Sequence, residues 1–380
     1  MDDPVHHLYV HLPFCGHRCG YCDFVTVAGD AIDHGTYVDA LMSELELERF
    51  RLGAPLRSVF LGGGTPSLTR PVDLRRLLDA LPSAAETTIE ANPETVTETL
   101  AALLLEGGVT RVSLGVQSFE PELLRVLERR AGPAEAVRAV DILRRAGFAN
   151  VSLDLIYGIP GQTPDTLRAD LERALALDPE HLSCYELEAK PGTRFTRAYG
   201  SSLARQAEAM ELYFEDVVTT LEGAGYRWYE TSNFCRKHAD GRDLRAQHNL
   251  SCWRGGDYVG VGIGAVSTRD RVRTRNTASV RRYVTALLTG EAPPRHVEVL
   301  SAGERCRERL MLALRLDEPF DPARVGPVID PAALDRLIRL DLIEGSAPTL
   351  RLTRRGRFLA NAVTVELTAD EEAAALAATL

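Results

Sequence analysis

The string YVHLPFCGHRCGYCDF, residues 9–24, leads from a short apolar run directly into a crowded group of cysteines. The group has the spacing C-x3-C-x2-C and consists of Cys15, Cys19 and Cys22. Thiolates are preferred ligands of iron–sulfur clusters and also bind zinc. Three cysteines on one loop leave one iron of a four-iron cubane without a protein ligand, open to a chelating molecule. Zinc stays as the alternative, since His17 or Asp23 could supply a fourth ligand.

Around this loop, the first two-thirds of the chain alternate short apolar runs with amphipathic stretches. The expected strands are residues 8–12, 58–61, 87–90, 111–116, 151–156 and 181–187. The expected helices are residues 36–51, 72–80, 94–106, 133–146, 164–177 and 203–222. Repeated strand–helix units predict an α/β fold with parallel strands, in an open sheet or a partial barrel. Functional side chains of such folds gather at the carboxyl ends of the strands.

Polar or glycine-rich segments follow three of these strands. The turn GGGTPS, residues 62–67, follows the second strand and exposes backbone amides that could bind a carboxylate or an amino group. Glu90 ends the third strand, where a helix cap at Asn92 is the alternative role for this segment. Gln117 ends the fourth strand and offers both donors and acceptors. We therefore expect these side chains at one ligand site.

The fifth expected strand contains a lone acid. Asp154 lies between leucines, and an unpaired carboxylate is costly to bury there. We expect it to meet a cation or the hydroxyls of a ligand. Arg129 is a candidate partner, and a solvated helix charge is the alternative for that arginine.

The composition is that of a soluble globular protein: 380 residues, 45% hydrophobic and 26% charged, with a net charge of −10. No apolar run approaches the roughly 18 residues that a membrane helix needs. The first residues include acids and no basic region, so we expect no signal peptide and a cytoplasmic location. The negative charge argues against nucleic acid as a partner, because a phosphate backbone needs a basic surface. Seven cysteines, three of them clustered, do not make a disulfide framework.

The last quarter of the chain has a different pattern. Two helices and a hairpin are expected at residues 303–316, 331–340, 342–344 and 350–353. This order is typical of a winged helix, here as a cap or interaction domain. We divide the chain into residues 1–290, a barrel with its extension, and residues 291–380, a small α+β domain. From residue 369 we expect a short helix or a frayed tail.

The cysteine spacing, together with the aromatic Tyr21 before the third cysteine, is similar to that of the radical S-adenosylmethionine (SAM) superfamily. The resemblance implies a [4Fe-4S] cluster whose open iron is chelated by the amino and carboxylate groups of SAM. It also implies that one electron from the cluster, supplied by a flavodoxin- or ferredoxin-type donor, cleaves SAM to methionine and a 5′-deoxyadenosyl radical.

From Tyr9 to about Asn361 the motifs resemble the oxygen-independent coproporphyrinogen III oxidase (HemN) family and its HemW-type heme chaperone relatives. The most specific are the cysteine loop and residues 62–66, 115–119, 154–163 and 260–264. The resemblance implies a partial (β/α)6 barrel with a small HemN-like C-terminal domain. It places the cluster-bound SAM at Tyr9, Gly63 and Glu90. It places a second SAM at Tyr21, Gly64, Thr65, Gln117, Arg129 and Asp154.

Several positions depart from the family patterns. Phe24 stands where the oxidase has another cysteine, which argues against coproporphyrinogen oxidation. The string HNLSCW keeps His248, a candidate heme ligand, but has Cys252 where HemW proteins have a tyrosine. Val266 stands where HemW proteins usually have a histidine, which removes an imidazole that could bind heme iron. His6 and His7 precede the first strand, and we expect them to be solvated.

Two functions are consistent with these features. The main expectation is an enzyme resembling the class C radical SAM methylases and cyclopropanases. Such an enzyme uses two SAM molecules and transfers a methyl or methylene carbon to an sp2 carbon of an unsaturated or aromatic small molecule. The alternative is a HemW-type heme chaperone, which binds heme and delivers it to acceptor hemoproteins. The retained His248 favours the chaperone, and Val266 favours the enzyme.

Overall fold

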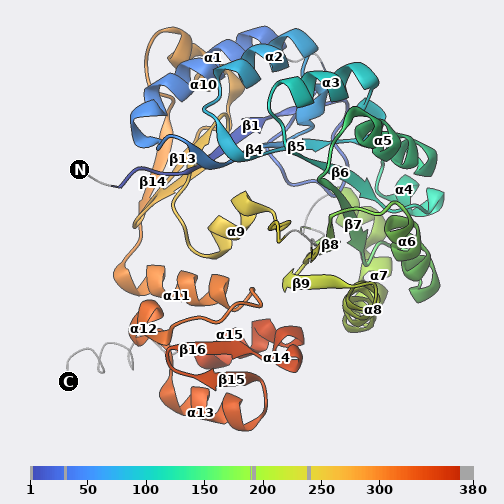
Figure 1. Cartoon of the computed structure of the whole chain (residues 1–380), viewed down its shortest axis with the longest axis vertical. Coiled ribbons are helices and arrows are strands. Elements are labelled where there is room, and N and C mark those ends of the chain that lie inside the picture. The colour runs from blue at the N-terminus through green and yellow to red at the C-terminus, as the bar shows by residue number, and fades with distance from the viewer. Residues whose placement is uncertain (1–2, 30–31, 189, 191–193, 238–240, 369–380) are drawn as a thin grey trace.

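The computed structural model describes residues 3–29, 32–188, 190, 194–237 and 241–368. Its six central strands are parallel: β1 (His7–Leu12), β4 (Leu56–Gly63), β5 (Ala84–Ala91), β6 (Arg111–Gln117), β7 (Val151–Tyr157) and β8 (His181–Glu186). The edges are β11 (Val259–Val261), β10 (Asn233–Arg236) and β9 (Tyr226–Glu230). The order is β11-β1-β4-β5-β6-β7-β8-β10-β9. The predicted parallel α/β sheet is confirmed, and it curves as a partial barrel does (Figure 1).

Helices cover the outer face of this curved sheet (Figure 1). They are α1 (His34–Glu48), α2 (Pro71–Ala80), α3 (Glu98–Glu106), α4 (Pro121–Val126), α5 (Pro133–Ala146), α6 (Pro164–Ala176), α7 (Arg194–Ala207) and α8 (Met210–Gly223). Proline in the first turn starts α2, α5 and α6, where its missing N–H costs nothing. The single helix expected over residues 203–222 is wrong, because α7 ends at Ala207 and α8 begins at Met210.

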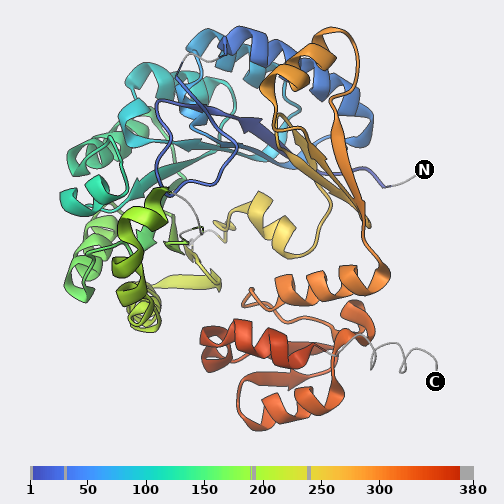
Figure 2. The same ribbon diagram turned by 180° about the vertical axis from the view of Figure 1, so that it is seen from behind.

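The structure contains further elements that the sequence did not reveal. A short two-stranded sheet, β2 (Phe14–Cys15) and β3 (Val27–Ala28), brackets the cysteine loop. A three-stranded sheet consists of β12 (Val266–Arg269), β13 (Val272–Asn276) and β14 (Arg295–Val299), and α10 (Val280–Leu288) packs on α1. The helix α9 (Gln247–Trp253) lies on the inner side of the curved sheet (Figures 1 and 2). It therefore occupies the open side of the partial barrel.

The C-terminal part has a hydrophobic core of its own, with Leu310, Leu337 and Ile343 among its buried members. Its elements are α11 (Ala302–Ala313), α12 (Pro322–Val325), α13 (Pro331–Arg339), β15 (Ile343–Ser346), β16 (Thr349–Leu352), α14 (Arg354–Phe358) and α15 (Ala360–Leu367). The expected small domain of helices and a hairpin is confirmed. The division at residue 290 stays a prediction, and the segment expected from residue 369 lies outside the described residues. No described helix is both long and apolar enough to cross a membrane.

Candidate functional site

The carboxyl ends of the parallel strands bring most of the predicted site residues to one edge of the sheet. In the strand register Leu12 pairs with Gly63, and Gly115 pairs with Asp154. The cysteine loop follows β1 directly, and Glu90 lies next to the last residue of β5. Parallel strands end on the same edge, so segments that are distant in sequence meet there.

All three cysteines of the loop are half-buried: Cys15, Cys19 and Cys22. The Cys15 Sγ lies 3.8 Å from the Thr65 hydroxyl at the end of β4. The Cys19 Sγ lies 3.6 Å from His17 Nε2 and 3.8 Å from the Glu128 carbonyl oxygen. The loop thus contacts the turn after β4 and the turn after α4.

Arg129 supplies the positive charge beside these thiols. Burial raises the pKa of the Cys15 and Cys19 thiols, and the nearby guanidinium opposes that rise because it stabilises the thiolates. Its Nη2 donates to Asn92 Oδ1 at 2.7 Å and to the Gly115 carbonyl at 2.6 Å. Its buried Nε has no hydrogen-bond partner among the described residues. Because thiolates are the iron-binding form, this cationic group fits a cluster at the loop.

The sulfur arrangement is not that of a single-ion site. In the described part of the chain, no three His, Cys, Asp or Glu side chains are placed to hold one metal ion. A cubane binds three cysteines through three different irons, so their sulfur atoms need not converge on one point. His17 Nε2 contacts the Glu128 carbonyl at 2.6 Å, which ties this imidazole to the main chain. The donor set therefore fits the cluster better than the zinc alternative.

The glycine turn after β4 holds the loop in place. Gly63 has φ of +115°, and its N–H donates to Glu90 Oε2 at 3.1 Å. A Cβ atom at Gly63 would lie 2.6 Å from the His11 ring, and one at Gly64 would lie 2.6 Å from the Pro13 carbonyl. Protein atoms therefore fill the Cβ positions of these two glycines, so that a larger residue would not fit there, and their role in ligand binding stays a prediction.

Asn92 is a site residue whose role the sequence left open. Its Nδ2 donates to the Thr65 hydroxyl at 3.2 Å, and its Oδ1 accepts from Arg129. Its side chain makes no helix-cap hydrogen bond. A polar chain therefore runs from Cys15 through Thr65 and Asn92 to Arg129. In the sequence, the signal that Asn92 belongs to the site was its position directly after the strand that contains Glu90.

Two half-buried carboxylates, Glu90 and Asp154, lie near this chain of contacts. Burial, aided by the charge of Asp154, raises the pKa of Glu90 to about 7. Burial also raises the pKa of Asp154, whose two oxygens both accept from the Ser113 hydroxyl at 3.1 Å. Asp154 makes no ion pair with Arg129, which is bonded to Asn92 and Gly115 instead. The charge of Arg111 lowers both pKa values but does not offset the effect of burial. Neighbouring acids in this state suit a ligand that brings positive charge or hydroxyls.

The remaining predicted residues divide between this edge and other places. Gln117 has φ of +72°, and its side-chain Nε2 lies close to the backbone of Gly115, as does Arg129 Nη2. Tyr21 packs edge-to-face on Phe195, with ring centroids 6.4 Å apart, and burial raises the pKa of its hydroxyl. Its ring therefore contributes to an apolar cluster between the cysteine loop and α7.

Tyr9 lies inside the barrel, between the cysteine loop and α9. Its hydroxyl contacts His11 Nδ1 at 3.0 Å, and His11 Nε2 contacts the Val25 carbonyl at 2.8 Å. On the other side its ring centroid is 6.1 Å from that of His248. His248 is buried at the beginning of α9, near the start of β4, and burial lowers its pKa to about 3. It does not join the residues at the carboxyl edge.

Known proteins resemble this chain along most of its length. The model of the radical SAM superfamily matches residues 9–174. The heme chaperone HemW of Mycobacterium tuberculosis is 36% identical over 94% of this chain and 93% of its own length. The heme chaperone HemW of Bacillus subtilis is 33% identical over 93% and 97%. The solved structure of HemN, the coproporphyrinogen III oxidase of Escherichia coli, covers 96% of this chain and 89% of its own with a TM-score of 0.77 and 22% identity.

These comparisons correct the main functional expectation. The curated relatives that match both the barrel and the C-terminal domain are named heme chaperones, so the expected methyl or methylene transferase is wrong. The likeness to the oxidase structure, at 22% identity, shows the shared fold alone. The cysteine loop lies within the region that matches the superfamily model, and that superfamily implies a [4Fe-4S] cluster and SAM. This chain belongs to the HemN/HemW-like family of the radical SAM superfamily.

Proposed function

We propose that this chain is a heme-binding chaperone, which holds heme and delivers it to acceptor hemoproteins in the cytoplasm. The observation that carries the proposal is the similarity to heme chaperones over 94% of the chain, barrel and C-terminal domain included. Heme then takes the place of the expected small-molecule substrate. Val266 replaces the histidine that HemW proteins usually have, so a different imidazole of this chain would bind the heme iron.

We further propose that the cysteine loop holds the [4Fe-4S] cluster and that SAM binds at its open iron, near Tyr9, Gly63 and Glu90. When bound, the cluster supplies an electron for SAM, and a flavodoxin- or ferredoxin-type protein would reduce the cluster. Arg129 balances the negative charge of the thiolates, and the buried carboxylates face positive charge on SAM. A second SAM is proposed at Tyr21, Gly64, Thr65, Gln117, Arg129 and Asp154.

Hemin titration of the anaerobically reconstituted full chain tests the chaperone proposal. We expect a saturable Soret band at one heme per chain, followed by transfer of that heme to an apo-hemoprotein. The loop-cysteine variants carry no cluster and serve as a comparison that separates cluster absorbance from heme absorbance. A chain that shows no Soret change, or that keeps its heme in the presence of every apo-acceptor, would contradict the proposal.

A further inference from the structure

A cavity of about 680 Å³ lies at the amino-terminal end of the barrel. His7 at the start of β1, Arg57 near the start of β4 and Glu86 near the start of β5 line it, so it faces away from the cysteine loop. Its other wall comes from α9, from residues before it such as Leu244, and from Arg254 directly after it. This volume is in the range of small-molecule sites, which run from about 300 to 1,000 Å³.

His7 presents an oriented imidazole to this cavity. It is half-buried and begins β1, so the expectation that it is solvated is wrong. Its Nδ1 lies 2.7 Å from the Ser58 hydroxyl, and that hydroxyl lies 3.3 Å from His248 Nδ1. Ser58 has one proton to donate. If His7 Nδ1 donates to Ser58 and Ser58 donates to His248, the Nε2 of His7 keeps a free lone pair.

The state of His7 suits metal binding. Burial, assisted by Arg57 and His6, lowers the pKa of His7 to about 4, so its ring is neutral at physiological pH. Neutral imidazole is the ligating form, and a hydrogen bond at the other ring nitrogen fixes the orientation of such ligands. The second imidazole, His248, is 5% exposed and stands behind Ser58 rather than in the cavity wall.

The charges around the cavity favour an anionic ligand. Arg57 is exposed and forms no ion pair with any carboxylate in the described part of the chain. The two acids of the wall are occupied: Glu86 accepts from the Gln247 N–H at 2.9 Å, and Asp243 accepts from Arg245. Arg57 therefore offers an uncompensated positive charge next to the imidazole.

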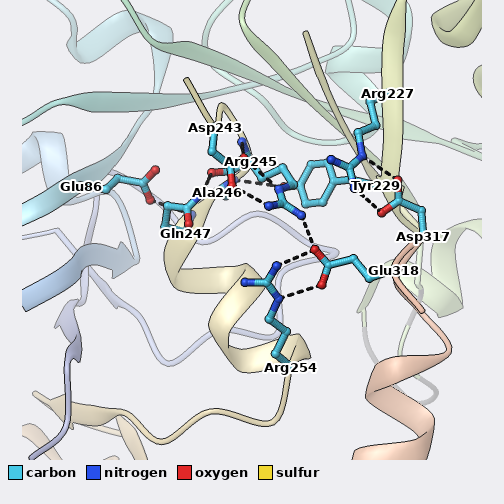
Figure 3. Close-up of polar contacts among 10 residues, drawn as sticks. All are labelled: Glu86, Arg227, Tyr229, Asp243, Arg245, Ala246, Gln247, Arg254, Asp317 and Glu318. Atoms are coloured by element: carbon cyan, nitrogen blue, oxygen red, sulfur yellow. Dashed lines mark hydrogen bonds and ion pairs between the residues drawn. The ribbon is translucent and has the colours of Figure 1, made fainter. Parts of the chain in front are cut away.

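Hydrogen bonds and ion pairs hold the α9 wall on both sides (Figure 3). On the barrel side Gln247 is bonded to Glu86, and on the other side Arg245 and Arg254 both donate to Glu318, which follows α11. The Ala246 N–H also donates to the Tyr229 hydroxyl at 3.2 Å. The cavity wall thus has a defined shape that depends on the C-terminal domain.

We propose that this cavity is the heme site, with His7 Nε2 as a ligand of the iron and Arg57 as a partner of a heme propionate. The inference rests on the proposed function, because heme combines two features that the cavity matches: an iron that takes imidazole, and carboxylates that pair with arginine. His248 is a positioning residue that holds His7 through Ser58. The C-terminal domain holds the α9 wall of the site in place through Glu318.

Hemin titration of His7→Ala and His7→Asn, each in the reconstituted full chain, tests the proposal. The asparagine can keep a hydrogen bond to Ser58 but cannot replace imidazole at the iron. We expect both variants to bind hemin at least tenfold more weakly, with a Soret band shifted from that of wild type. Added imidazole should restore the wild-type band. His6→Ala is the matched control, since His6 contacts the Pro55 carbonyl outside the cavity lining, and it should behave as wild type.

Iron-free protoporphyrin IX separates ligation from a merely structural role. It carries both carboxylates and no iron, so we expect wild type and His7→Ala to bind it equally and Arg57→Glu to bind it more weakly. Wild-type hemin affinity and spectrum in both His7 variants would overturn the heme site while leaving the chaperone function intact. Equal weakening of hemin and protoporphyrin by His7→Ala would also overturn the ligand role. Failure of the wild-type chain to bind hemin would overturn the proposed function itself, and the site with it.

Discussion

The two ends of the parallel strands differ in the chemistry they offer. At the carboxyl end, thiols lie beside Arg129, and two half-buried carboxylates have raised pKa values. At the amino end, two imidazoles have lowered pKa values, and the exposed Arg57 lines a cavity. The first end suits iron held by sulfur and a ligand with positive charge, whereas the second suits iron held by nitrogen and a ligand with negative charge. The two iron-containing groups proposed here would therefore not compete for ligands.

β1 connects these two ends. His7 is its first residue, and the cysteine loop follows its last. Between them Tyr9 contacts His11, which in turn contacts the Val25 carbonyl of the cysteine loop, while the other side of Tyr9 faces His248. Changes at one end can thus be tested for effects at the other.

Removal of a loop cysteine should have the largest effect, and that effect should be confined to the carboxyl end. Cys15→Ala is expected to abolish the cluster, because three thiolates are the whole protein ligand set of the cubane. Iron and sulfide content and cluster absorbance measure this. Cys306→Ser, a half-buried cysteine in the C-terminal domain, is the control and should keep the cluster. Loss of hemin binding in Cys15→Ala would break the separation between the two ends.

Gly64→Ala tests how the carboxyl end is assembled. The added Cβ would meet backbone atoms of Pro13 and Phe14, which cannot move as a flexible side chain can. We expect a loss of about 2–3 kcal/mol in the free energy of unfolding and poor cluster incorporation. Chemical denaturation measures the first and iron content the second. Gly200→Ala, in α7 with no atoms near the new Cβ, is the control. Equal stability of the two variants would show that the loop is not packed against this turn.

Acid should destabilise the amino end through His248. Burial lowers its folded pKa to about 3, so the unfolded chain binds more protons once the pH falls below about 6.5. Stability contributed by the neutral ring is complete above that pH and is lost as the pH falls toward 3. From pH 7 to pH 5 the wild type should lose about 2 kcal/mol more than His248→Gln. Denaturation curves at both pH values measure this, with exposed His296→Gln as the control. Parallel pH profiles of wild type and His248→Gln would exclude a buried neutral ring.

The smallest effect is expected at the contact between α9 and the C-terminal domain. Glu318→Gln removes the shared partner of Arg245 and Arg254, a partly exposed set of ion pairs worth about 1 kcal/mol. We expect heme to dissociate several-fold faster, measured by transfer to an excess of apo-acceptor, with the cluster unchanged. Glu344→Gln removes an exposed pair with Arg351 and should have no effect. An unchanged dissociation rate in Glu318→Gln would mean that the contact with the C-terminal domain does not hold the α9 wall of the heme site in place.

Much of the carboxyl end was predictable from the sequence. The thiol spacing is a local pattern. The glycine turn, Glu90 and Gln117 each follow or end an apolar run that predicts a strand, and Asp154 lies within such a run. Because parallel strands end on the same edge, local sequence patterns were enough to predict that these residues lie close together. What the sequence could not show was their pairing, since Arg129 reaches Asn92 and not Asp154.

The amino end depended on the tertiary structure. His7 looks like part of a solvated leader, and His248 looks like an isolated histidine at the start of a helix. Only the fold places both against Ser58, which is separated from His248 by 190 positions. The sequence by itself determined the cysteine loop, the parallel strands and the family, because these depend on spacing and periodicity along the chain. Tertiary packing decided the cavity, the placement of His7 and His248 on Ser58, and the contacts to Glu318. The reason is that the starts of strands carry no common motif, and their neighbours come from segments far along the chain.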